Sequence, residues 1–488
     1  MNQRPHGKQQ SLIIQADGAL AGAAGPMRAP AAGAAKPDGV LSVFDAVTIM
    51  VGLVVGVGIF KTPSIVAANV GSEWSFILVW VAGGLVTLVG ALCYAELSAA
   101  HPHAGGEYHF LSRAYGRPVA MLFGWARCTV IQTGAIAGVA FMLGDYVAQL
   151  FPLGPYGAAI YAALAVCIFT GINVVGTAEG KSLQVAVTLI EIAALAAVIL
   201  FGLFGAPDGG AAPVPAAAPE TTALGVAMIF VLLTYGGWNE AAYLTGELRD
   251  APRNIARVLT LGTLILVTLY TLANLALLSI LGLDGLRGSE AVAADMMRRV
   301  AGPAGEVIVT LAVVVAAVST LNATIFTGAR VFYAMAQDLS VMRWMAIWNG
   351  RGKNPANGQI AQAAIALALI AMGAVTRDGF KAMVDYTAPV FWGFLLLVGV
   401  ALFVLRRRYP GRELPYRVPL YPFTPILFCL TCSYMLYASI AHTGVAALAG
   451  LAVLALGTPI LLFTRKAGDD AATAAPHTDI ARGNDYPR

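Results

Sequence analysis

Glycine residues interrupt two apolar segments at points where a membrane helix would be more stable with almost any other residue. The first segment reads GLVVGVGIFKTP from residue 52 to 63 and places Gly56 and Gly58 in its middle. The second reads MIFVLLTYGGWNEAAYLTGE from residue 228 to 247 and contains Gly236 and Gly237. Glycine in a helix interior costs roughly 1 kcal/mol relative to alanine. The sequence therefore predicts an unwound break in each segment.

An unwound break presents backbone groups that can bind a zwitterion. The half-helix after the break begins with unpaired N–H groups and the positive end of its dipole, which favour a carboxylate. Unwound carbonyl groups, such as those of Val54, Leu233 and Gly236, favour an ammonium group. An α-amino acid carries both charges and would satisfy both sets of groups. The alternative is that the glycines only permit close helix packing.

The composition requires a lipid environment for most of the chain. Of the 488 residues, 58% are hydrophobic and 11% are charged, whereas soluble domains carry about 25% charged residues. A window of about 20 apolar residues predicts an all-α membrane protein with about twelve transmembrane helices. The expected spans are residues 42–68, 75–98, 118–150, 155–175, 182–205, 221–245, 256–281, 303–333, 359–376, 384–405, 422–441 and 445–464.

The two breaks occur at matching positions of an inverted repeat. The second break lies five spans after the first, so the two units would enter the membrane from opposite sides. Such a pair of discontinuous helices is the pattern that points to the central site of a secondary transporter. We expect the unwound backbone to line a cavity enclosed by protein, because lipid cannot satisfy its polar groups.

Domain organisation and topology follow from the flanking segments. Residues 1–40 and 466–488 are rich in Ala, Gly, Pro or polar residues and are predicted to be disordered tails, around a transporter domain at 41–465. The loops on the side of the tails carry most of the arginine residues, which predicts a multi-pass protein of the cell inner (plasma) membrane with both termini cytoplasmic. This distribution also accounts for the net charge of +4 without a nucleic-acid partner.

Several motifs together carry a family resemblance. They are VGLVVGVGIF at 51–60, GALCYAEL at 90–97, AGGEYHFL at 104–111, YGGWNEAAY at 235–243 and NATIFTGARVFYAMAQD at 322–338. This ordered set resembles the amino acid–polyamine–organocation superfamily and is similar to bacterial relatives of the L-type amino acid transporters. The resemblance implies a LeuT-type fold, in which ten core helices form a five-plus-five inverted repeat with discontinuous helices one and six, followed by two further helices. It implies amino acid transport by alternating access.

The resemblance also implies which residues contact the substrate. The positions that match the family's contacts at the two breaks are Val54, Gly56, Val57, Gly58, Leu233, Tyr235 and Gly236. The chain departs from the family pattern at two of them. Val57 stands where a serine is common, so a hydroxyl contact to the carboxylate is lost. Leu233 stands where an aromatic lid residue is common, which affects closure and side-chain selectivity.

A carboxylate lies inside the fifth predicted span. Gln184, Thr188 and Glu191 share one helical face, and Glu191 lies about 13 Å from the start of the span at 1.5 Å per residue. An ionisable residue at this depth is a functional candidate by default. Sodium-independent relatives often carry lysine here, in contact with the first break and the eighth span. Two interpretations of the glutamate stay open: it holds a proton or binds a cation such as Na⁺ near Ser319 and Thr320, or it is a permanently neutral side chain with a structural role.

Other polar residues have simpler explanations than a role in substrate binding. Arg127 is near enough to the predicted cytoplasmic surface to extend its guanidinium to it, and Glu240 either holds a closed state or faces an inner vestibule. His101 and His103 lack a third ligand at a fixed spacing, so no metal is expected. Residues 429–432 form a Cys-x-x-Cys inside a span, where small buried hydrophobic residues are expected and not a redox pair. No nucleotide-binding motif or other cofactor signal occurs.

Three other functions fit the sequence less well. A carrier of polyamines or other organic amines would have no use for N–H groups directed at a carboxylate. An intramembrane enzyme would need a nucleophile with a base, or a metal site, and no such set can be assembled from the spans. A sensor that binds substrate without moving it is the more distant alternative. The amino acid itself, the choice between exchange and symport with H⁺ or Na⁺, and any partner protein are not indicated by the sequence.

Overall fold

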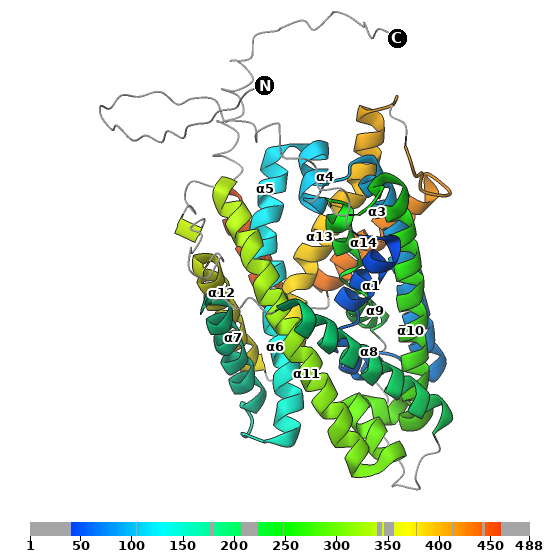
Figure 1. The fold of residues 1–488 in the computed structure, drawn as a ribbon, viewed down its shortest axis with the longest axis vertical. Helices are drawn as coiled ribbons and strands as arrows, with labels where there is room; N and C mark the ends of the chain where they lie inside the picture. Colours follow the sequence, from blue (N-terminus) through cyan, green and yellow to red (C-terminus); the bar gives the residue numbers. More distant parts are fainter. Residues whose placement is uncertain are drawn as a thin grey trace, which may run out of the picture. The chain divides into compact units, whose positions relative to one another are not determined.

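The described part of the chain is helical. The computed structural model describes residues 41–459 except 104, 176–179, 206–222, 247, 339–343, 346–355, 377, 412–413 and 442–444. Within these residues the one β-type pairing is an isolated bridge between Leu41 and Leu248, and all longer regular elements are helices (Figure 1). The predicted tails at 1–40 and 466–488 lie outside the described residues.

The helices follow the order expected from the apolar segments. They are α1 (Val43–Val54), η1 (Val57–Phe60), α2 (Thr62–Ala68), α3 (Glu73–Ala100), α4 (Gly106–Tyr115), α5 (Arg117–Ala126), η2 (Arg127–Ile131), α6 (Gln132–Leu150), α7 (Gly157–Val175), α8 (Gly180–Phe204), α9 (Leu224–Thr234), η3 (Trp238–Gly246), α10 (Ala251–Arg287), α11 (Val292–Asp338), α12 (Ala356–Thr376), α13 (Gly379–Arg408), α14 (Phe423–Ala441) and α15 (Val445–Leu456).

Eight helical segments of the described chain are long and apolar enough to cross a membrane. They correspond to predicted spans two to four and seven to eleven, with α5, η2 and α6 forming one continuous segment. The other four predicted spans coincide with α1 to α2, with α8, with α9 to η3, and with α15. The first and sixth spans are shorter helices because each is interrupted at its glycines.

The first break begins where α1 ends at Val54. The chain then runs through Gly56, which has an extended backbone (φ −120°, ψ −172°), into the four-residue helix η1 and on to α2. Pro63 lies in the first turn of α2, where its fixed φ suits the helix and its missing N–H costs nothing. Any residue can adopt the extended backbone of Gly56, so the conformation at this position does not require glycine. A Cβ there would lie 3.9 Å from the Thr320 hydroxyl, and glycine instead leaves space beside α11.

The second break does require glycine. After α9 ends at Thr234, Gly237 has φ +102°, a left-handed conformation that side chains strongly disfavour. A Cβ on Gly236 would lie 2.7 Å from the Leu233 carbonyl oxygen. The local backbone therefore requires glycine at Gly236 and Gly237. The prediction of an interrupted sixth span is confirmed.

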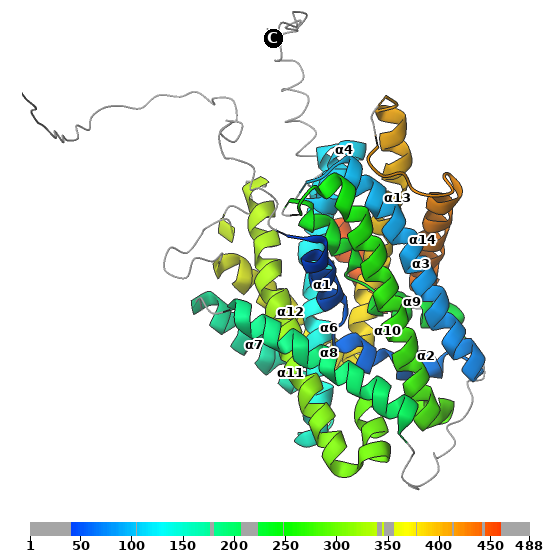
Figure 2. The same cartoon turned by 45° about the vertical axis from the view of Figure 1, so that its right-hand side comes forward.

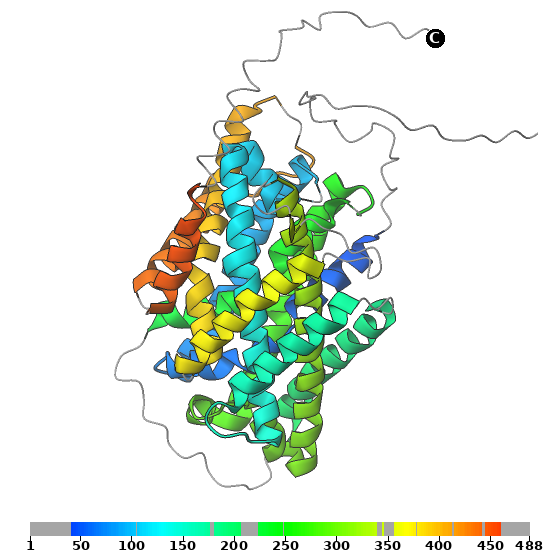
Figure 3. The same ribbon diagram turned by 90° about the vertical axis from the view of Figure 1, so that its left-hand side faces the viewer.

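Helices five spans apart lie next to one another. The first span packs on the sixth through α1 with η3 and α2 with α9, and α3 packs along α10. The pairs α6 with α11 and α7 with α12 also pack together, and Figure 2 shows α7 close to α12. This pairing is the one that two inverted five-helix halves produce. The last two spans, α14 and α15 in orange and red, lie at one edge of the bundle (Figure 3).

Arginine residues gather at one end of the bundle. We call this the basic end and define it by Arg113, Arg117, Arg406, Arg407 and Arg408, where α4 and α13 end and α5 begins. The bridge between Leu41 and Leu248 and the start of α10 mark the same end of the first, sixth and seventh spans. The basic end is therefore also the end at which the first span and α10 begin.

Candidate functional site

The two breaks face a common cavity of about 280 Å³. Its lining from the breaks comprises Val54, Gly56, Val57, Gly58, Leu233, Thr234, Gly236 and Gly237. Six of the seven predicted substrate-contact positions therefore lie around one space, although they come from segments nearly 180 residues apart in sequence. The exception is Tyr235.

Tyr235 points away from the cavity. Its ring is fully buried against Trp80 and Tyr270, with centroids 6.1 and 5.0 Å away. Its hydroxyl donates to the Trp80 carbonyl oxygen at 3.3 Å. The side chain of Tyr235 thus anchors the end of α9 to α3 and α10, and a contact to substrate could come only from its backbone.

The backbone of the first break is partly paired within the protein. The Val54 carbonyl oxygen accepts from the Gly56 N–H at 2.8 Å and from the Tyr270 hydroxyl at 2.7 Å. A carbonyl oxygen has two lone pairs, so an ammonium group would have to displace one of these donors. η1 begins at Val57, and the first N–H groups of a helix have no partner inside it. Val57 and Gly58, at the start of η1, both line the cavity.

Apolar side chains make up most of the remaining wall. Phe230 of α9 faces Phe380 of α13, with ring centroids 6.2 Å apart. Val139 and Met142 of α6 and Met383 of α13 also line the cavity. A concave, mostly apolar wall with a few polar groups is typical of sites for small organic molecules.

The predicted coupling residues are only partly brought together. Thr320 lines the cavity, and its hydroxyl lies 3.4 Å from a carboxylate oxygen of Glu191 on α8. The Glu191 side chain is 4% exposed, so this carboxyl group lies inside the protein behind the first break. Ser319 is buried but is not part of the cavity wall. The side chains of Gln184 and Thr188 lie outside the described residues.

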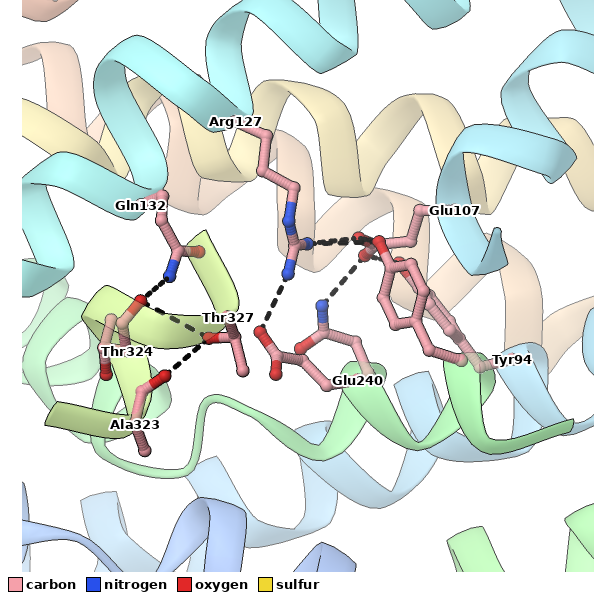
Figure 4. Close-up of polar contacts among 10 residues, drawn as sticks. Tyr94, Glu107, Arg127, Gln132, Glu240, Ala323, Thr324 and Thr327 are labelled. Carbon is pink, nitrogen blue, oxygen red and sulfur yellow. Dashed lines mark hydrogen bonds and ion pairs between the residues drawn. The ribbon is translucent and has the colours of Figure 1, made fainter. Parts of the chain in front are cut away.

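The expectation that Arg127 extends to the membrane surface is wrong. Its guanidinium lies at the cavity wall and pairs with Glu240 at 2.9 Å and with Glu107 at 3.3 Å (Figure 4). The Tyr243 hydroxyl accepts a further bond from it at 3.1 Å. The Arg127 side chain is 13% exposed. The buried Glu107 and the partly exposed Glu240 stabilise the guanidinium where it lies, whereas the level of Arg117 is about 15 Å of helix away.

Glu107 is the fixed centre of this network. Its carboxylate is 4% exposed and accepts from the Tyr94 hydroxyl at 2.7 Å, the Asn239 amide at 2.9 Å and the Tyr243 hydroxyl at 3.1 Å. Since Asn239, Glu240 and Tyr243 all belong to η3, the half-helix after the second break is tied to α4 and to the α5–η2 segment. We call these contacts the Arg127 closure. They lie between the cavity and the basic end.

A π-helical turn accompanies the closure. η2 (Arg127–Ile131) is wound more widely than the α-helices on either side, and both of its end residues line the cavity. Such turns often occur at functional sites. The next residue, Gln132, donates to the Thr324 carbonyl oxygen at 3.0 Å and so joins this helix to α11 (Figure 4).

A second set of contacts lies on the opposite side of the cavity. Lys61, directly after η1, pairs with Asp145 of α6 at 3.0 Å and donates to the Glu290 carbonyl oxygen. The Tyr146 hydroxyl donates to the Phe60 carbonyl oxygen at 2.8 Å. We call these contacts the Lys61 closure. It ties the half-helix after the first break to α6. In the same way, the Arg127 closure ties the half-helix after the second break to α4 and to the α5–η2 segment.

The other candidate ligands do not form a metal site. Among the described residues, no group of three or more His, Cys, Asp or Glu side chains is arranged to hold a metal ion. Cys429 and Cys432 are free thiols packed among apolar helices. His103 instead stacks on His109, with ring centroids 4.2 Å apart.

Comparison with known proteins identifies the family to which the chain belongs. A family model described as amino acid permease matches residues 41–461. The chain is 29% identical to the serine/threonine exchanger SteT of Bacillus subtilis (strain 168) over 78% of this chain and 86% of the relative. It is 29% identical to the b(0,+)-type amino acid transporter 1 of Mus musculus, over 83% of this chain and 82% of the relative. For the human large neutral amino acids transporter small subunit 2, the identity is 27% over 86% and 79%. The chain belongs to the amino acid permease family, within the amino acid–polyamine–organocation superfamily.

Proposed function

We propose that this protein is a secondary transporter that carries an amino acid across the membrane by alternating access. The observation that carries the proposal is the single cavity between two broken helices, with a separate closure on either side of it. Each closure ties one half-helix to the helices around it. Releasing one closure while the other holds would open the cavity to one side of the membrane at a time. The names of the similar proteins support amino acids as the substrate class.

The substrate is held as a zwitterion between the breaks. Its carboxylate accepts from the N–H groups at the start of η1, at Val57 and Gly58, where the helix dipole is positive. Its ammonium group binds carbonyl oxygens of the unwound segments at Gly236 and, after displacement of a donor, at Val54. Leu233 contacts the substrate side chain from the position of the lid. Tyr235 contributes through its backbone.

Coupling to an ion involves the residues behind the first break. Glu191 and Thr320 are joined by a long hydrogen bond, and Thr320 adjoins Gly56. A proton on Glu191, or a Na⁺ ion bound by Glu191, Thr320 and backbone carbonyl oxygens, would sense movement of the first break because the two are in contact. We include Ser319, which precedes Thr320 in sequence, in this proposed coupling site.

The domain between the tails, 41–465, performs transport in this proposal. The basic end faces the cytoplasm, as the concentration of arginine residues favours. Both tails then lie in the cytoplasm, and the protein spans the inner (plasma) membrane. The Arg127 closure is accordingly the cytoplasmic one, and the Lys61 closure is external.

Uptake of labelled compounds into proteoliposomes tests the proposal. A panel of neutral, acidic and basic amino acids and of polyamines would be measured with and without gradients of H⁺ and Na⁺. We expect saturable uptake of at least one amino acid, and its loss in a Gly58→Leu variant that remains monodisperse. Uptake of amines alone, or uptake that Gly58→Leu leaves intact, would contradict the proposal.

A further inference from the structure

A second cavity, of about 210 Å³, lies at the basic end and is separate from the substrate cavity. It is formed by the ends of α3 and α13 together with the segment that follows α13. The residues relevant to its chemistry are Glu96, His101, Arg406, Tyr409, Leu414 and Arg417. Neither the breaks nor the two closures contribute to it. It is thus available for a different ligand.

The acidic side chain that lines this cavity already has hydrogen-bond partners within the protein. Among its described lining residues Glu96 is the one acid, and its side chain is 3% exposed. Its carboxylate accepts from the Arg406 Nε and Nη2 atoms at 2.5 and 2.6 Å and from the Val418 N–H at 2.6 Å. Arg406 also lies over the Tyr421 ring, 3.7 Å from its centroid. Glu96 is thus bound to Arg406 and to the backbone of Val418, and this pair forms part of the cavity wall.

The mouth of the cavity is positively charged. Arg417 is exposed and lines it, and Arg407 and Arg408 follow Arg406 on α13. Arg408 donates to the Arg113 carbonyl oxygen and Arg113 to the Tyr409 hydroxyl, and both of these partners are uncharged. Glu413 lies outside the described residues. The guanidinium of Arg417 at the cavity, with Arg407 and Arg408 at the same end, provides the charge and the donors that a phosphate group requires.

An apolar surface begins beside this charged mouth. Six residues after Arg417 the chain enters α14, whose outer face exposes Phe423 (73%), Leu427 (51%) and Leu430 (62%). Figures 1 and 2 both show α14 beside α13 and reaching toward the end at which α13 finishes. In a membrane this face contacts acyl chains. A ligand that carries a phosphate and acyl chains would satisfy both surfaces, whereas free phosphate would use only the first.

We propose that this cavity binds the phosphate of an anionic phospholipid, with Arg417 as its main contact and the acyl chains along α14. Basic pockets between helices at the membrane surface have the chemistry that holds such headgroups. The bound lipid would bridge the end of α13 and the segment before α14, whose shared anchor is Glu96. The proposal does not depend on the transported substrate.

Native mass spectrometry of the purified protein tests this site. The protein would be titrated with phosphatidylglycerol or phosphatidylcholine, and the fraction that retains one lipid would be measured. We expect phosphatidylglycerol to be retained preferentially and Arg417→Gln to weaken its retention at least about fivefold. Arg407→Gln is the matched control, because it removes the same charge from the same end without lining the cavity, and it should change retention less than twofold. Both arginine residues are exposed, so neither change should unfold the protein.

Three results would overturn the proposal. Equal retention of the two lipids would show that the headgroup charge is not recognised. Equal losses in the two variants would show that the surface charge acts as a whole and not through the cavity. Displacement of phosphatidylglycerol by millimolar inorganic phosphate would identify the site as one for free phosphate.

Discussion

Substituting glutamine for Glu240 should favour opening of the cavity toward the basic end. Glu240 accepts one bond from Arg127 at 2.9 Å, and its side chain is 41% exposed. The variant leaves Arg127 bound to Glu107 and Tyr243, so no buried charge is left without a partner. The effect therefore measures one contact between η3 and η2 and not a general loss of structure.

The size of the effect follows from the exposure of Glu240. Hydrogen bonds to charged groups contribute about 1.5–3 kcal/mol when buried, and exposed ion pairs contribute at most about 1 kcal/mol. At the exposure of Glu240 we expect about 1 kcal/mol. If the closed state alone makes this contact, its loss shifts the equilibrium toward the open state about fivefold.

The shift can be measured with a thiol placed in the cavity. Val139 lines the cavity on α6 and takes no part in either closure or in the proposed substrate contacts, so Val139→Cys provides the reporter. The rate of modification by a membrane-impermeant maleimide, added on the side of the basic end, should rise about fivefold with Glu240→Gln. Asp250→Asn is the matched control, because Asp250 is an exposed acid near the same end that pairs with the exposed Arg253 and not with the Arg127 closure. An unchanged rate with Glu240→Gln, or an equal rise with Asp250→Asn, would refute the role of the Arg127 closure.

Three further substitutions test the site itself. Gly58→Leu should weaken substrate binding at least tenfold, because the added side chain fills the space at the start of η1 and removes charged hydrogen bonds worth about 1.5–3 kcal/mol; undiminished affinity in equilibrium binding would contradict it. Leu233→Phe should change the ranking of small and large neutral amino acids, because the residue occupies the lid position; overlapping competition profiles would exclude this role. Glu191→Gln should abolish the dependence of uptake on a pH gradient or a sodium gradient while sparing exchange, because it removes the ionisable group behind the first break. Unchanged uptake under both gradients would make Glu191 structural and favour an ion-independent exchanger.

The glycine pattern predicted the broken helices because it reports local backbone energetics. Gly237 needs a left-handed backbone and Gly236 has no room for a Cβ, so both leave a signal in the sequence. Composition and apolar length likewise predicted a helical membrane protein. The sequence also marked Glu191 as a candidate, since a lone carboxylate in an apolar span stands out without knowledge of its neighbours.

The closures depend on contacts between distant segments and could not be predicted in this way. Arg127 and its partner Glu240 are separated by 113 residues, and nothing near Arg127 in the sequence indicates that two carboxylates surround it. A charged residue inside a predicted span suggests a functional role. For Arg127, however, the nearby predicted membrane surface offered a simpler place for the charge. The direction of the Tyr235 side chain was missed for a related reason, since family position indicates where the backbone lies and not where a ring packs. Lys61 and Asp145 were not singled out, because each lies near a span end, where charges are common.

The central claim is that both charged ends of an amino acid are recognised at the two breaks. The most direct measurement is competition against uptake of the best amino acid from the panel, using the same compound without its carboxylate and the same compound without its amine. Each truncated compound loses one charged contact worth about 1.5–3 kcal/mol, so both should inhibit at concentrations at least about tenfold higher than the intact amino acid. Inhibition by the amine at the concentration of the amino acid would contradict the account and indicate an amine carrier.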